Sequence, residues 1–153
     1  MKVENDILIP ELARLLNEDK EVRFTPSGVS MRPFIEGDKD SVILAGIKCP
    51  PRRGDILLAH VNTLNGRKSY VLHRLVRIES KENQQHFILQ GDGNLIGEEM
   101  CLLPDIIGRV IRIENPAGKQ KPLTRGWLWY KLRPFRKYLL KIYRHTVLKW
   151  NYK

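Results

Sequence analysis

Cysteine is scarce in this 153-residue sequence, and cofactor motifs are absent from it. The two cysteines, Cys49 and Cys101, stand in unrelated contexts, without the spacing of zinc ligands or of a disulfide framework. The sequence therefore predicts a protein of a reducing compartment that uses no metal or other cofactor.

Long apolar runs are also missing. A membrane-spanning helix needs about 20 consecutive apolar residues, and no segment approaches that length. The N-terminus is polar and acidic, and the short apolar run Ile7-Leu8-Ile9 ends at Pro10, which is not typical of a signal peptide. We therefore expect the chain on the cytoplasmic side of the membrane.

Acidic residues are absent from the last part of the chain. Residues 121–153 contain ten Lys or Arg and no Asp or Glu, whereas residues 1–120 hold 17 basic and 17 acidic side chains. The whole net charge of +10 thus lies in the tail, which also holds all three tryptophans and four of the five tyrosines. A neutral body makes nucleic acid the least favoured partner.

The length is that of one domain with a real core, and the middle of the chain has β character. Short apolar runs alternate with Gly, Pro, Asn and Asp, and Asn65-Gly66 is a strong turn signal. We expect a mainly β fold of coiled antiparallel sheets. The predicted strands are Val22-Thr25, Ser41-Ala45, Asp55-Val61, Tyr70-Ile78, Phe87-Leu89 and Ile107-Ile113.

Helices are expected on both sides of the β region. Over residues 8–17, Pro10 fits the first turn, and Leu12, Leu15 and Leu16 share one face. We divide the chain into a helical lead-in, a β domain, and a linker with a basic aromatic helical tail, at residues 1–21, 22–114 and 115–153.

The tail helix is expected from Pro134 to about Lys149. Its apolar stripe admits three interpretations: docking on its own domain, binding to an anionic membrane surface, or binding to nucleic acid. The second would make the protein peripheral at the inner membrane face. The predicted stripe consists of Phe135, Leu139, Ile142, Tyr143 and Val147, with Lys137, Lys141 and Arg144 largely opposite.

The most informative stretch is Ser27-Gly28-Val29-Ser30-Met31-Arg32-Pro33-Phe34, followed by Gly37-Asp38. Gly28 tolerates a positive φ and Pro33 fixes its own φ, so a tight turn here can direct the Ser30 hydroxyl outward. An ordinary turn before a strand is the alternative.

Three later boxes accompany this turn: Gly54-Asp55 before an apolar strand, His73-Arg74 within a strand, and Gly91-Asp92-Gly93-Asn94. In this order the boxes, which span roughly residues 26–113, resemble the S24/S26 serine peptidases, the signal peptidases and LexA-type self-cleaving repressors. The residues in these boxes are similar to those of the small stand-alone S24/S26-like proteins of Bacteroidetes. The resemblance implies coiled antiparallel β-sheets and cleavage of a peptide or protein substrate.

The resemblance also implies roles for the site residues. Ser30 would be the nucleophile, and His73 stands where many members have a lysine base. Imidazole suits that role, because it accepts a proton near neutral pH without deep burial. Asp92 would accept a hydrogen bond from the other ring nitrogen of His73, although its glycine-rich turn would also explain an aspartate there.

The expected oxyanion hole differs from that of many signal peptidases, in which a serine two residues before the nucleophile helps to bind the oxyanion. Gly28 stands there, so the expected donor is the backbone N–H of Ser30. Met31 and Phe34 are expected to line the substrate cleft or to pack in the core, and Asp38 to be structural. The predicted function is a serine endopeptidase with a Ser30–His73 dyad and an acyl-enzyme. The alternative is a non-catalytic, peptidase-like binding module.

Overall fold

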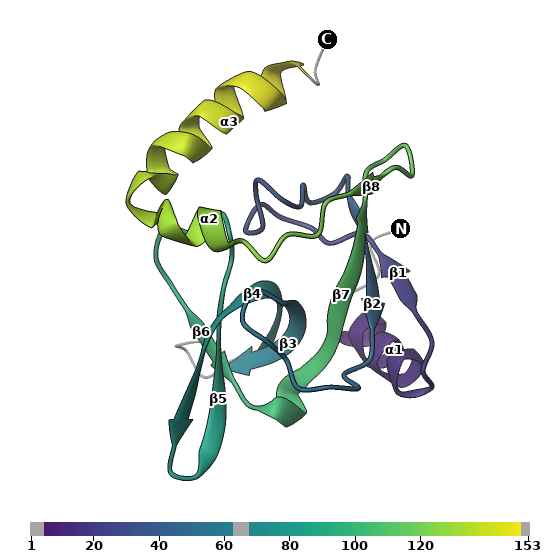
Figure 1. The fold of residues 1–153 in the computed structure, drawn as a ribbon. Coiled ribbons are helices and arrows are strands. Elements are labelled where there is room, and N and C mark those ends of the chain that lie inside the picture. The colour runs from purple at the N-terminus through teal and green to yellow at the C-terminus, as the bar shows by residue number, and fades with distance from the viewer. Residues whose placement is uncertain (1–4, 63–67, 151–153) are drawn as a thin grey trace.

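The architecture is a single antiparallel sheet with helices at both ends of the chain (Figure 1). The computed structural model describes residues 5–62 and 68–150. Along the sheet the strands follow the order β1-β2-β7-β3-β4-β5-β6, and β8 pairs with β7. The strands are β1 (Val22–Phe24), β2 (Ser41–Ala45), β3 (Ile56–Asn62), β4 (Lys68–Lys81), β5 (Gln84–Gln90), β6 (Glu99–Cys101), β7 (Ile106–Glu114) and β8 (Gln120–Lys121).

The central strand β3 is buried on both faces. Ile56 and Leu58 belong to one apolar cluster, whereas Leu57 and Ala59 belong to a second. Successive side chains of a strand point to opposite faces, so a nearly continuous apolar run is what a strand between two cores requires. The two apolar clusters therefore lie on opposite faces of β3.

The N-terminal helix α1 (Asn5–Asn17) covers the first of these clusters. Leu12 and Leu16 are fully buried and Leu15 is half-buried, which confirms the predicted apolar face. The predicted position of Pro10 was wrong: the helix begins three residues earlier than expected, so Pro10 lies inside it. Tertiary contacts of Leu8 and Ile9 with the core extend the helix past a residue that lacks a backbone N–H.

The prediction of a mainly β fold is confirmed, and so are all six predicted strands, within a few residues at their ends. Two short strands, β6 and β8, were not predicted. They contain three and two residues, which are too few to show an alternation of apolar and polar side chains. The predicted turn at Asn65-Gly66 lies outside the described residues.

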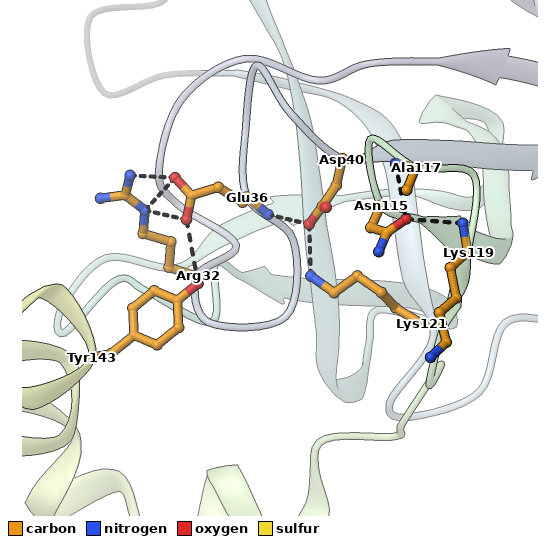
Figure 2. Close-up of polar contacts among 8 residues, drawn as sticks. All are labelled: Arg32, Glu36, Asp40, Asn115, Ala117, Lys119, Lys121 and Tyr143. Atoms are coloured by element: carbon orange, nitrogen blue, oxygen red, sulfur yellow. Dashed lines mark hydrogen bonds and ion pairs between the residues drawn. The ribbon is translucent and has the colours of Figure 1, made fainter. Parts of the chain in front are cut away.

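The expected linker at residue 115 begins as a turn between β7 and β8. Asn115 Oδ1 accepts hydrogen bonds from the N–H groups of Ala117 and Lys119, over 3.1 and 2.8 Å (Figure 2). Lys121 Nζ then pairs with the buried Asp40 carboxylate over 2.6 Å. The chain after the turn is therefore tied back to the sheet.

The aromatic and basic tail is helical. It forms α2 (Trp127–Lys131), a 3-10 turn η2 (Arg133–Phe135) and α3 (Arg136–Trp150); a further 3-10 turn, η1 (Leu103–Asp105), precedes β7. In Figure 1 α3, at the yellow end of the chain, lies beyond the end of the sheet rather than against its faces. None of the helices in the described part of the chain has the length and apolar character needed to cross a membrane.

Candidate active site

Ser30 lies in a turn that is closed by an unusually tight approach between two glycines. Gly28 has φ +89°, and a Cβ atom at Gly37 would lie only 1.9 Å from the Gly28 carbonyl oxygen. The Asp38 N–H donates to the Pro26 carbonyl over 2.8 Å and ties the two ends of the segment together. The sequence folds this way because both positions lack a side chain.

A second glycine-rich turn, Gly91-Asp92-Gly93-Asn94, packs on the Ser30 turn. The Gly93 N–H donates to the Ser30 carbonyl over 2.7 Å, and a Cβ at Gly91 would lie 2.5 Å from the same oxygen. The Gly91–Asn94 turn thus fixes the backbone of Ser30, although the two segments are far apart in the sequence.

Ser30 and His73 line the same cleft, which has a volume of about 150 Å³. One wall is the Ser30 turn and the other is the part of β4 that contains His73. The dyad residues predicted from the sequence therefore border one cavity. The other lining residues are Pro26, Ser27, Gly28, Met31, Ile35, Gly37, Tyr70, Val71 and Leu72.

His73 is buried, and its ring is held by a carboxylate. Its Nδ1 lies 2.9 Å from Oε2 of Glu99, a residue of the short strand β6. An ionised carboxylate can only accept hydrogen bonds, so this contact requires the proton on Nδ1. In the neutral imidazole Nε2 then carries the lone pair, which is the form a general base needs.

Asp92 differs from the expectation that it would bond to His73. Both of its oxygens accept from the guanidinium of Arg74: Nε lies 2.9 Å from Oδ1, and Nη2 lies 2.8 Å from Oδ2. Neighbouring side chains on a strand point to opposite faces, so an acid that meets Arg74 lies on the far side of β4 from His73.

The register of the sheet explains why Glu99 reaches His73 instead. Leu75 pairs with Leu89 of β5, and Leu89 pairs with Glu99 of β6. His73 is two residues before Leu75 and therefore shares its face. Cross-strand pairing thus places Glu99 on the same face as the histidine.

The Arg74–Asp92 ion pair connects several segments on the side of β4 opposite His73. Arg74 Nη1 also donates to the carbonyls of Gly54 and Thr124, over 2.8 and 2.7 Å, and Trp129 Nε1 donates to the Asp92 carbonyl over 2.8 Å. Three predicted boxes and the start of the tail meet at this buried pair. Its contacts fix the Gly91–Asn94 turn, which in turn bonds to Ser30.

The remaining predicted residues divide between cleft and core. Met31 borders the cleft and is also buried in the first apolar cluster, as core packing would require. Phe34 packs edge-to-face on Trp129, with ring centroids 5.9 Å apart, and Arg74 lies over its ring. Asp38 adopts φ +64° within the turn, as a structural residue of that segment would.

Sequence reasoning missed Glu99 and the structural importance of Arg74. Glu99 follows another glutamate in a segment without strand periodicity, and only the pairing of β6 with β5 reveals its position. Arg74 directly follows His73 in the sequence, but a single arginine does not indicate which carboxylate it will bind. No signal in the sequence alone separates Glu98 from Glu99.

Among the described residues, no three His, Cys, Asp or Glu side chains gather as a metal site would require. Comparison of the chain with protein-family models, with curated proteins and with solved structures found no significant match.

Proposed function

We propose that this protein is a serine endopeptidase of the S24/S26 type, with the coiled-sheet fold of LexA and the signal peptidases. The observation that carries the proposal is that Ser30 and His73 line one cleft while the other ring nitrogen of His73 contacts Glu99. The order of the four sequence boxes supports the same assignment.

In the first half of the reaction, Ser30 Oγ attacks the carbonyl carbon of a peptide bond. His73 Nε2 takes the hydroxyl proton, and the Glu99 carboxylate stabilises the imidazolium through its contact with Nδ1. The Ser30 N–H is the proposed donor to the oxyanion. The C–N bond then breaks, the leaving amine receives the proton from His73, and an ester to Ser30 remains.

In the second half, His73 takes a proton from a water molecule as that water attacks the ester. The proton passes back to Ser30 Oγ when the acyl–oxygen bond breaks, which releases the carboxylic acid and restores the dyad. A single oxyanion donor instead of two typically lowers a rate by about 100-fold or more, so turnover is expected to be slow.

The proposed substrate is an extended peptide with small side chains near the cut bond, as the resemblance to signal peptidases implies. Its lining combines apolar side chains, among them Met31, Ile35 and Leu72, with polar groups such as those of Ser30 and His73, and its volume suits small groups. Peptides of this kind bind by strand addition to a sheet edge, so shallow pockets rather than charges would set specificity.

The experiment is to incubate the full chain with a library of peptides and to detect new termini by mass spectrometry. Ser30→Ala is expected to abolish cleavage while the circular dichroism spectrum and the denaturation midpoint stay unchanged. The matched control is Ser80→Ala, since Ser80 is exposed near the end of β4 and outside the cleft.

Cleavage that persists in Ser30→Ala would overturn the proposal. If neither form cleaves but both bind the same peptides, the alternative of a non-catalytic binding module would replace it.

A further inference from the structure

Three large side chains of the tail are exposed on one face. Phe135, Tyr138 and Ile142 retain 60%, 66% and 58% of their accessible surface. Phe135 ends η2, which runs directly into α3, and Tyr138 and Ile142 lie on α3 at i+3 and i+7, so the three share one side of the helix. We call these three residues the outer stripe. An apolar face that is left in water is an unusual arrangement for a helix of a single folded chain.

The contacts of α3 with the rest of the protein lie on a different face. Arg136 is buried, where its Nε donates to the Trp129 carbonyl over 3.2 Å and its guanidinium lies 5.5 Å from the Trp129 ring. Further along the helix, the Tyr143 hydroxyl donates to Glu36 over 3.4 Å, and Figure 2 shows its ring directed toward Arg32 and Glu36. These contacts fix the rotation of α3 about its axis, and the outer stripe faces the solvent.

The stripe predicted from the sequence therefore divides in two. Leu139 and Tyr143 are half-buried, whereas Phe135 and Ile142 are exposed together with Tyr138. The side chain of Val147 is not among those described. Docking on the domain accounts for one edge of the helix only, and within residues 5–62 and 68–150 the outer stripe makes no side-chain hydrogen bond or ring contact with the β domain.

Positive charge occupies the sides of α3 that the outer stripe leaves free. Lys137, Lys141 and Arg144 are exposed on α3, and residues 121–153 contain no acidic side chain. Lys137 and Arg144 follow Phe135 and Ile142 by two residues and therefore lie on the opposite side of the helix, whereas Lys141, three residues after Tyr138, lies at the edge of the stripe.

The short helix α2 adds interfacial aromatics to the same part of the molecule. Trp127 and Leu128 are exposed, and the Arg53 guanidinium lies 4.8 Å from the Trp127 ring centroid and 4.7 Å from that of Tyr130. Tryptophan and tyrosine favour the boundary between lipid headgroups and acyl chains, because one end of each ring is polar.

We propose that α2 and α3 form a docking surface for an anionic lipid membrane, with the outer stripe entering the interface and the basic residues meeting the headgroups. Charge complementarity selects this occupant: a second copy would bring two basic tails together, and a nucleic acid would leave the apolar stripe without a partner. The inference goes beyond the peptidase function and does not depend on cleavage.

The test is co-sedimentation of the full chain with vesicles of phosphatidylcholine alone or with about one-third phosphatidylserine. Binding is expected only to the anionic vesicles, and it should weaken as salt rises, because screening shortens the reach of the charges. Phe135→Gln, Tyr138→Gln and Ile142→Gln combined keep every charge and are expected to weaken partitioning about tenfold or more. Lys137→Gln, Lys141→Gln and Arg144→Gln combined should do the same.

The matched control is Ile96→Gln, which removes an exposed apolar side chain in the loop before β6 and should leave partitioning unchanged. Ser30→Ala should also bind normally, which separates this inference from the proposed function. Several results would overturn the inference: no binding to anionic vesicles, normal binding by the triple glutamine variant of the stripe, self-association through the stripe in sedimentation velocity, or binding to random duplex DNA instead of vesicles.

Discussion

The guanidinium of Arg74 donates to both carboxylate oxygens of Asp92, and the two side chains retain only 5% and 3% of their accessible surface. Removing one partner of such a pair leaves an uncompensated buried charge. Asp92→Asn is therefore expected to lower the free energy of unfolding by about 3–5 kcal/mol in urea denaturation. The Gly91–Asn94 turn should loosen with it.

A surface pair provides the comparison. Arg77 also bonds to two carboxylates, Glu79 and Glu98, but it is exposed. Arg77→Gln is expected to leave the denaturation midpoint almost unchanged, because exposed ion pairs contribute little. Equal effects of the two substitutions would contradict the role assigned to the Arg74–Asp92 pair.

Glu99 is expected to position His73. Glu99→Gln keeps the shape of the side chain but offers an amide that can also donate, so the proton is no longer directed to Nδ1. The cleavage rate should fall by about 10²–10⁴-fold with little change in KM, and its dependence on pH should change. The measurement is the pH profile of kcat and kcat/KM on a peptide found in the library screen.

The control for Glu99 is its neighbour. Glu98 bonds to Arg77 and pairs with Arg133, away from His73. Glu98→Gln should cleave at nearly the normal rate. A loss of the same size in both variants would show that negative charge at the start of β6, rather than the contact with His73, affects the reaction.

Gly37 is expected to be intolerant of any side chain. Gly37→Ala would place Cβ against the Gly28 carbonyl oxygen, so the Ser30 turn must move; we expect a loss of more than about 3 kcal/mol of stability, together with a loss of cleavage. Gly118→Ala meets nothing within 4 Å, and only its φ of +76° is unfavourable. That variant should lose about 1–2 kcal/mol and cleave normally. Thermal denaturation and the peptide assay measure both effects, and similar losses would contradict the close approach.

The two cysteines are expected to differ in reactivity. Burial raises the pKa of the Cys101 thiol to about 12, with a further contribution from the Asp105 charge, whereas Cys49 is exposed. The thiolate is the reactive form, so Cys101 stays unreactive at pH 8. Ellman's reagent should modify one thiol in the folded protein and two in denaturant.

The same shift makes stability depend on pH. In the unfolded chain a cysteine ionises near pH 8.5, well below the value in the folded protein. The contribution of Cys101 is therefore fully present below about pH 8.5 and is lost as pH rises toward 12. Cys101→Ala should flatten this part of the profile, and two fast-reacting thiols in the folded protein would contradict the burial of Cys101.

Some structural features could be predicted from local sequence because local physics decides them. The alternation of short apolar runs with turn residues identified the strands, and the spacing of Leu12, Leu15 and Leu16 identified the buried face of α1. The glycines around Ser30 marked a tight turn, since a close backbone approach excludes side chains. The position of Ser30 and His73 on one cleft was expected from the order of the boxes.

Other contacts of the site depend on which strands pair with each other, and local sequence does not determine that pairing. Glu99 meets His73 only because β6 pairs with β5 in one register, and Asp92 meets Arg74 because β4 turns that side chain to its other face. The sequence alone determined the composition of the tail: its basic charge, its aromatics and its helical spacing. Tertiary contacts of Arg136 and Tyr143 decided its rotation, and with it which apolar side chains remain outside, because a helix can turn about its axis until specific contacts fix it.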